Sequence, residues 1–512
     1  MYDAFAGRQI LTVTNVTAGT TVFGPNGELL SYSMAGTGAN RRLIMWNSTL
    51  AISGAYVFDT WSPAYLGTIN GLRGVQWNVS IPYIPGSPAI SIIGEGYIFM
   101  TYVNQLSYPP IYEDMAFPAT LDRDSAGNYP TSVNPLWFVN RTNLDTHWPS
   151  VTRNILDGIY ARWDQAKMII HGYSIATGQE IWASDPVPMG WGIFNQGLQL
   201  AYGKLYFASY DGHLRTYNSS TGKLIWDYYM GNAGFENAYG TWPTYGFTIA
   251  DHKIYITNDE HSPDSIPWRG GKLTVLNAET GELVWSIDGR LRHTTIADGV
   301  ATAFNLYDNQ AYTFGKGPSK TTVSAPQTAI AVGSSIIIQG TVTDQTPASK
   351  DTPAISDESM GAWMAYLHMQ KPMPTNATGV SVTLTAIDPN GNSQTIGTAT
   401  SDIGGTYGID WTPPVEGKYS IMATFAGTES YGSSYATTYL SVSAPAATPA
   451  PAATPTPTPV ATPTPTPITT ASPSPAPQPE AGPSTDMYII AAAAAVVIVV
   501  VAVAAVVLRK RK

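Results

Sequence analysis

The sequence predicts an all-β surface protein, in which β-propeller blades precede an immunoglobulin-like sandwich and one transmembrane helix anchors the chain. Two observations carry this prediction: a turn-and-strand motif recurs in the first part of the chain, and a long uncharged apolar run lies near its end. The 512 residues include no cysteine. Disulfides, cysteine-ligated zinc, iron–sulfur clusters and c-type haem attachment are therefore excluded.

The repeated motif is a Thr-Gly pair followed by an apolar strand that ends in tryptophan. Its three clear copies are Thr177, Gly178 and Trp182; Thr221, Gly222 and Trp226; and Thr280, Gly281 and Trp285. The glycine can take the positive φ of a tight turn, and the β-branched residues that follow favour a strand. Because a period of about 40–45 residues with four strands is typical of a propeller blade, we expect blades here. An insertion at residues 259–271 explains the longer second spacing.

This motif resembles the pyrroloquinoline-quinone-like (PQQ-like) repeat family of β-propellers, in which a Thr-Gly-x-x-x-Trp segment closes each blade. Weaker copies extend the resemblance over residues 1–317, or about five to six blades, and are found at residues 2–11, 43–46, 75–78, 92–103, 136–140 and 296–315. The chain thus opens inside a blade, without an export signal. We expect an incomplete, N-terminally truncated propeller; the alternative is that residues 2–16 complete the last blade.

Residues 318–443 change to short alternating strands with an Asp-Pro-Asn-Gly hairpin signal at residue 388, which predicts an immunoglobulin-like β-sandwich. Tyr419 is expected to brace a strand as a tyrosine corner. An insertion at residues 345–378 contains Met360, Met364, His368, Met369 and Met373. Thioether and imidazole groups suit copper, but the same residues also fit a short amphipathic helix that packs onto a neighbouring surface.

The C-terminal part predicts a stalk and an anchor. Residues 444–486 are rich in Pro, Thr and Ala, which favours an extended spacer without helix or sheet. The apolar run begins at Met487 and ends at Leu508, long enough to cross a hydrocarbon core of about 30 Å. The basic tail, residues 509–512, should remain cytoplasmic. We therefore expect a single-pass cell-membrane protein with its N-terminal bulk outside the cell. Without a sorting motif such as LPxTG, an archaeal envelope is the expected setting.

The leading functional hypothesis is binding or scaffolding of a protein, glycan or envelope component, and it requires an aromatic-rich exposed face. A net charge of −10 argues against a nucleic-acid partner. One alternative is a PQQ-dependent oxidoreductase whose cofactor site lies partly on missing blades. A passive structural element of the envelope is the other.

Candidate cofactor and metal residues are sparse. The family resemblance implies PQQ held with calcium, but no Asp, Glu and Asn cluster or cysteine pair stands at matching positions, so no catalytic or cofactor-binding residue is assigned and no cofactor is predicted. These observations favour a protein that is not an enzyme, and leave an enzymatic function as the alternative. One loop gathers carboxylates and an imidazole that could bind a divalent ion, or could simply cap turns; its residues are Asp259, Glu260, His261 and Asp264.

Six Asn-x-Ser/Thr sequons are glycosylation candidates if the chain lies outside the cell. They are at Asn15, Asn47, Asn78, Asn140, Asn218 and Asn376. Asn78 and Asn140 lie in strand-like contexts, which makes them the weakest of the six.

Overall fold

A computed structural model describes most of the N-terminal 444 residues of the chain. The described ranges are residues 1–3, 6–53, 67–84, 86, 88–104, 111–142, 144, 151–188, 195–258 and 268–444. All of them belong to one compact unit, Met1–Ala446. The stalk, the apolar run from Met487 to Leu508 and the basic tail lie outside these ranges. Among the described residues, no helix is long and apolar enough to cross a membrane.

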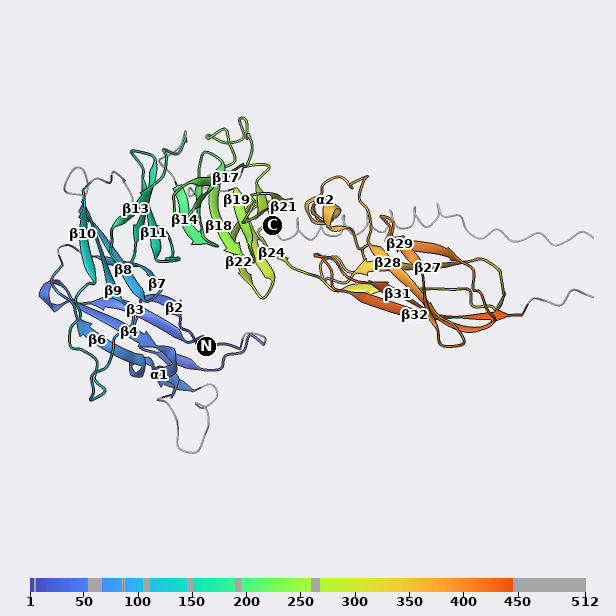
Figure 1. Cartoon of the computed structure of the whole chain (residues 1–512), viewed down its shortest axis with the longest axis horizontal. Coiled ribbons are helices and arrows are strands. Elements are labelled where there is room, and N and C mark those ends of the chain that lie inside the picture. The colour runs from blue at the N-terminus through green and yellow to red at the C-terminus, as the bar shows by residue number, and fades with distance from the viewer. Residues whose placement is uncertain are drawn as a thin grey trace, which may run out of the picture. The chain divides into compact units, whose positions relative to one another are not determined.

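Six consecutive antiparallel sheets occupy residues 20–314, and we number them blades 1 to 6 (Figure 1). Blade 1 consists of β2 (Thr20–Phe23), β3 (Leu29–Ala35), β4 (Arg42–Asn47) and β6 (Val75–Ser80). Blade 2 consists of β7 (Ala89–Gly94), β8 (Tyr97–Asn104), β9 (Ile111–Pro118) and β10 (Trp137–Arg141). Blade 3 consists of β11 (Ile159–Asp164), β12 (Ile169–Ser174) and β13 (Glu180–Ala183).

The last three blades carry the later copies of the motif. Blade 4 consists of β14 (Asn195–Ala201), β15 (Lys204–Ser209), β16 (His213–Asn218) and β17 (Leu224–Tyr229). Blade 5 consists of β18 (Thr244–Ala250), β19 (Lys253–Asn258), β20 (Lys272–Asn277) and β21 (Leu283–Asp288). Blade 6 consists of β22 (Leu291–Ala297), β23 (Val300–Asn305) and β24 (Gln310–Phe314). In each sheet the strands pair in chain order, as in the blade of a β-propeller.

The turns define two ends of each blade. In blades 2 to 6 the turn between the first two strand positions has two consecutive residues with positive φ, at residues 95–96, 157–158, 202–203, 251–252 and 298–299. In blade 3 the first strand position is reduced to two isolated bridges, between Val151 and Arg162 and between Leu156 and Ile159. Adjacent blades align at this end: the Glu95 carboxylate accepts hydrogen bonds from the backbone N–H groups of Asp157 (2.7 Å) and Gly158 (2.8 Å). We call this end the tight-turn face and the opposite end the loop face.

The Thr-Gly-Trp motif forms the contact between successive blades. Gly178, Gly222 and Gly281 have φ of 72°, 69° and 76°, as the predicted turn requires. A Cβ atom added to Gly281 would lie 2.7 Å from the ring of Trp226 in the preceding blade. Trp182 likewise covers Gly222, and its indole N–H donates to the Ser219 carbonyl at 2.7 Å. Each turn therefore needs glycine twice, for its backbone conformation and for the tryptophan that lies on it.

Blade 2 supplies a fourth tryptophan in this role, although its own sequence lacks the Thr-Gly pair. Trp137 lies over Gly178, where an added Cβ would meet its ring at 2.5 Å, and its indole N–H donates to the Ile175 carbonyl at 2.6 Å. The same contact thus links blades 2 and 3, 3 and 4, and 4 and 5.

Described residues at the start of the chain make the hydrogen bonds of a blade-end turn. Asp3 N–H donates to the Arg8 carbonyl and Gly7 N–H to the Asp3 carbonyl, the pattern that Asn218, Gly222 and Lys223 make in blade 4. The sequence did not predict the insertion between the third and fourth strands of blade 1. It contains α1 (Ser48–Ser53), β5 (Thr68–Asn70) and η2 (Gly71–Gly74), and β5 pairs with β1 (Thr12–Thr14); η1 (Gly38–Asn40) precedes β4.

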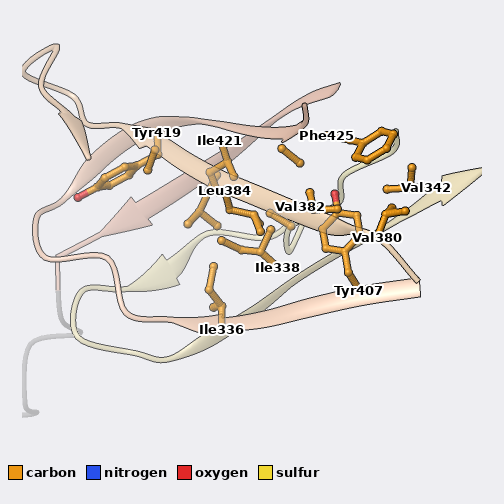
Figure 2. Close-up of a cluster of buried hydrophobic side chains, with 14 of the residues drawn as sticks. Ile336, Ile338, Val342, Val380, Val382, Leu384, Tyr407, Tyr419, Ile421 and Phe425 are labelled. Atoms are coloured by element: carbon orange, nitrogen blue, oxygen red, sulfur yellow. The ribbon is translucent and has the colours of Figure 1, made fainter. Parts of the chain in front are cut away.

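Residues 319–443 form two sheets around a separate core. The immunoglobulin-like sandwich stays a prediction. One sheet contains β25 (Ser319–Thr321), β27 (Ile336–Asp344) and β30 (Thr406–Trp411); the other contains β26 (Ile330–Ala331), β32 (Ser434–Ser443), β31 (Gly417–Phe425), β28 (Ser381–Ile387) and β29 (Ser393–Thr400). Ile338, Leu384 and Ile421 lie between the sheets in this core (Figure 2).

Tyr419 closes one end of the sandwich core (Figure 2). Its hydroxyl donates to the Val415 carbonyl at 3.0 Å and accepts from the Val415 N–H at 3.1 Å. This contact with backbone four residues upstream is the predicted tyrosine-corner bracing.

The insertion at residues 345–378 contains one helix, α2 (Asp357–Met369). Met360 packs against the sandwich core, whereas Met364 and Met369 pack against a cluster of blades 5 and 6. His368 is hydrogen-bonded to the Ser349 hydroxyl at 3.0 Å. Met360, Met364 and Met369 thus belong to a helix that packs onto neighbouring surfaces, which is one of the two alternatives that the sequence offered.

Candidate functional site

The loop face of blades 4 to 6 carries a group of aromatic side chains that we call the aromatic rim. The members of the aromatic rim are Phe235, Tyr239, Trp242, Trp268 and Tyr307. They lie on connections that join the second strand to the third within a blade, or the last strand to the next blade. None of the five is fully buried, and Phe235 is fully exposed. Phe235 and Tyr307 are exposed, and the other three are half-buried. Aromatic side chains gathered at a surface are typical of interaction sites.

The hairpin that carries Phe235 connects blade 4 to blade 5. Its two strands meet at a bridge between Asn232 and Thr241. The Asn237 side chain accepts from the N–H groups of Tyr239 (2.9 Å) and Gly240 (3.0 Å) and donates to the Thr241 carbonyl at 2.8 Å. These hydrogen bonds within the hairpin order the turn from which Phe235 projects.

Aromatic contacts tie this hairpin to the blades beneath it. Tyr239 packs edge-on against the buried Tyr210 of blade 4, with ring centroids 5.0 Å apart. On its other side the Tyr239 ring lies 6.2 Å from Trp268, again edge-on. The guanidinium of Arg290 lies 5.7 Å from the Trp268 ring centre, within the range of a cation–π contact.

Polar contacts fix the loop that leads to Trp268. Arg269 donates from Nε (3.0 Å) and from a terminal nitrogen (2.8 Å) to the carboxylate of Glu236, which also accepts the Arg269 backbone N–H at 2.8 Å. These hydrogen bonds lower the pKa of Glu236. Tyr307 of blade 6 donates to the Trp268 carbonyl and accepts from the Gly271 N–H at 3.1 Å. The rim therefore spans three blades as one connected set.

A second cluster of functional-type side chains is buried between blades 2 and 3. The Asp114 carboxylate is fully buried and accepts from two guanidinium groups, those of Arg141 (2.6 Å) and Arg162. Arg162 also donates to the Thr101 hydroxyl at 2.7 Å, and Arg141 to the Tyr160 hydroxyl at 2.8 Å. Burial raises the pKa of Tyr160 above its ordinary value. Because the cluster joins four strands of two blades, we interpret it as a structural contact rather than a catalytic site, and we call it the buried clamp.

The predicted metal loop falls, in the sequence, between two strands of blade 5. Asp259, Glu260, His261 and Asp264 lie outside the described residues, between β19 and β20, where the sequence placed an insertion. Within the described ranges, no three His, Asp or Glu side chains gather closely enough to hold a metal ion.

The six sequons lie in different environments. Asn15, Asn78, Asn140 and Asn376 are exposed, whereas Asn47 and Asn218 are half-buried. The Asn218 side chain accepts from the N–H groups of Ser220 and Thr221, both at 3.0 Å, so it caps the turn of the blade motif. Exposure of Asn78 and Asn140 on β6 and β10 shows that a strand context does not by itself remove a sequon from solvent.

Sequence reasoning missed both the rim and the buried clamp. The rim had a readable signal, because residues 230–243 form a long, aromatic-rich connection between two apolar strands. The clamp had none, since Asp114, Arg141 and Arg162 are far apart in sequence and belong to three different strands.

The fold places the protein in the class of blade-repeat proteins of the β-propeller type. A family model for PQQ-type repeats, described as outer membrane protein assembly factor BamB, matches residues 166–411. The match runs from blade 3 through blade 6 and continues into the sandwich. It thus agrees with the repeat resemblance seen in the motif.

Curated relatives match part of the chain at low identity. The quinohemoprotein alcohol dehydrogenase of Comamonas testosteroni is 26% identical over 217 residues, which cover 40% of this chain and 28% of the relative. The dehydrogenase subunit of the quinone alcohol dehydrogenase of Gluconobacter oxydans (strain 621H) is 27% identical over 224 residues, covering 41% and 28%. The chain thus spans little more than a quarter of the length of these relatives.

Solved structures with similar arrangements include BamB from Moraxella catarrhalis. It is 11% identical, with a TM-score of 0.30, and the alignment covers 77% of this chain and all of that one. The computationally designed Ika8 protein is also 11% identical, with a TM-score of 0.32, covering 80% of this chain and all of the design.

Proposed function

We propose that this chain is a membrane-anchored cell-surface protein that binds or scaffolds a protein, glycan or envelope component through its aromatic rim. The observation that carries the proposal is Phe235, a fully exposed phenylalanine at the tip of an ordered hairpin. A soluble surface gains nothing from such a side chain, and burying it against a partner would remove its apolar area from water.

The composition of the rim fits recognition better than catalysis. Aromatic side chains bring large contact areas with few rotatable bonds, and their polar tips accept or donate hydrogen bonds at the edge of an interface. The pair formed by Glu236 and Arg269 adds a polar border, with Arg269 largely exposed beside it. Exposed aromatic side chains with a polar border suit a protein surface or the apolar face of a sugar ring.

The proposed location rests on the sequence. The apolar run from Met487 to Leu508, the Pro/Thr-rich stalk before it and the basic residues after it favour one span with the blades outside the cell. Exposed sequons at Asn15 and Asn376 are compatible with that side of the membrane. Protease added to intact cells should then remove the blades and spare an epitope on the tail. Cleavage of the tail from outside would overturn this topology.

Binding is tested with a substitution at the rim and a matched control on the other face. The full chain in detergent is tested against isolated cell envelopes and an array of envelope glycans. Phe235→Ser should weaken binding at least tenfold, because it removes the exposed ring without altering a packed contact. Phe23→Ser is the control, since Phe23 is also exposed but precedes a tight turn of blade 1. Equal loss in both variants, or in neither, would refute the rim as the binding surface.

A quinone-dependent oxidoreductase is the second candidate, favoured by the names of the two curated relatives. Pyrroloquinoline quinone with calcium is added to the full chain, and a saturable change in quinone absorbance is measured beside alcohol oxidation. Saturable absorbance together with oxidation would replace the binding proposal. A third candidate is a passive envelope element. It would self-associate in sedimentation and would bind neither the envelope glycans nor the quinone.

A further inference from the structure

Blade 6 ends differently from the blades before it. In blades 3 to 5 the glycine turn before the fourth strand is covered by the tryptophan of the preceding blade. Blade 6 consists of three described strands, and its first-position turn at residues 298–299 shows that these are strands one to three. Trp285 of blade 5 therefore faces a blade that supplies no corresponding turn within the described residues. Its ring instead lies 5.4 Å from Phe314 of β24.

Helix α2 packs at this place. It lies along β21, the strand that carries Trp285. Met364 and Met369 pack, as Trp285 and Phe314 do, against the cluster of blades 5 and 6 formed by Leu273, Ile287, Leu291 and Ala303. The helix backbone also comes close, because a Cβ added to Gly361 would lie 3.0 Å from the Ser286 carbonyl. Lys371, just after the helix, forms a 2.8 Å ion pair with Asp288 at the end of β21.

The beginning of α2 is bound to the sandwich. The Asp357 carboxylate accepts from the Glu429 N–H at 3.0 Å, the Ser430 N–H at 3.1 Å and the Ser430 hydroxyl at 2.6 Å. Met360 packs against the sandwich core, and its sulfur lies 4.0 Å from the Tyr431 hydroxyl. One short helix thus contacts two separate cores, through its first turn and through its last.

We infer that α2 takes the packing role of a turn that blade 6 does not supply within the described residues, and so seals this blade with a helix from the sandwich. The apolar side chains around Trp285 would otherwise border water, and covering them is what stabilises an open sheet end. The sandwich is then a part of the blade array rather than a module tethered to it. Local opening of blade 6 requires release of α2, so the two regions are coupled in stability.

Hydrogen exchange of the full chain tests this inference. The double variant Met364→Asp, Met369→Asp places charges against an apolar cluster, and we expect exchange of β21 and β24 amides to rise at least tenfold. Amides of β28 and β31 should keep their protection, because their core does not include either residue. Met373→Asp is the matched control, since Met373 is 46% exposed on the same insertion. Unchanged exchange in β21 and β24 would overturn the inference.

If the double variant loses amide protection throughout the chain, Gly361→Val tests separately whether α2 seals blade 6. In an undocked helix this change has little effect on β21 or even favours the helix, since glycine is a poor helix former. In the docked arrangement the added side chain meets the Ser286 carbonyl and pushes α2 away. Faster exchange in β21 and β24 supports the seal; exchange equal to that of the unmodified chain refutes it.

Discussion

At the scale of single residues, the glycines of the blade motif meet two requirements, a positive φ and room for a tryptophan ring, and substitutions can separate the two. Gly281 and Gly299 have the same φ of 76°, but only Gly281 lies under a tryptophan; an added Cβ at Gly299 meets nothing within 4 Å. Any L-residue at either position bears the conformational cost of positive φ, about 1–2 kcal/mol. Alanine at Gly281 must also displace the Trp226 ring.

We therefore predict that Gly281→Ala lowers the free energy of unfolding by about 1–3 kcal/mol more than Gly299→Ala does, the range for overpacking a filled contact. Urea denaturation of the two variants measures the difference. Equal costs would mean that the tryptophan adjusts freely, and the motif would then be a turn signal without a packing role.

Residue-level chemistry was also the part most readable from sequence. The Thr-Gly turns and the bracing by Tyr419 depend on backbone geometry that a few adjacent residues dictate, and the structure confirms both. The role of Trp137 was not predicted, because its partner turn belongs to the next blade and its own blade lacks the Thr-Gly pair.

At the scale of elements, the buried clamp shows how two blades are joined by charge as well as by apolar packing. Asp114 on β9 neutralises part of the charge of Arg141 on β10 and Arg162 on β11. Removing its charge leaves two guanidinium groups in a site that excludes water. Breaking one side of a buried pair costs about 3–5 kcal/mol.

Asp114→Asn should therefore destabilise the chain by about that amount, with the largest loss of amide protection in blades 2 and 3. Asp122→Asn, at an exposed position after β9, is the control and should be close to neutral. A small effect of Asp114→Asn would show that water or an anion reaches the guanidinium groups when the carboxylate is absent.

The strands were predictable because alternation and turn residues act locally, while what lies between them was not. The insertion of α1, β5 and η2 into blade 1 is recognised only through contacts such as the Trp46 indole with the Gly71 carbonyl, at 2.6 Å. The helix in the sandwich insertion was one of two alternatives that the sequence predicted. The surface against which it packs, on blade 5, could not be predicted from the sequence of the helix alone.

At the scale of the whole molecule, carboxylates connect segments that are distant in sequence. Glu236 holds the hairpin of the rim to the Trp268 loop, Glu279 pairs with Lys204 across blades 4 and 5, and Asp357 holds α2 to the sandwich. Hydrogen bonds from Arg269 and Lys204 lower the pKa of Glu236 and Glu279. Burial raises the pKa of Asp357, but hydrogen bonds led by that of Ser430 outweigh it, so its pKa is also lowered.

A depressed folded-state pKa means that these groups contribute their full stability above the unfolded-state pKa and lose it as the pH falls through the folded-state value. We therefore predict that the melting temperature is steady near neutrality and falls once the pH drops below about 5. The triple variant Glu236→Gln, Glu279→Gln, Asp357→Asn should start lower and show a shallower acid decline in calorimetry. Glu358→Gln, an exposed acid on α2, should follow the unmodified curve. A triple variant whose acid decline is as steep as that of the unmodified chain would place the acid-sensitive contacts in other carboxylates.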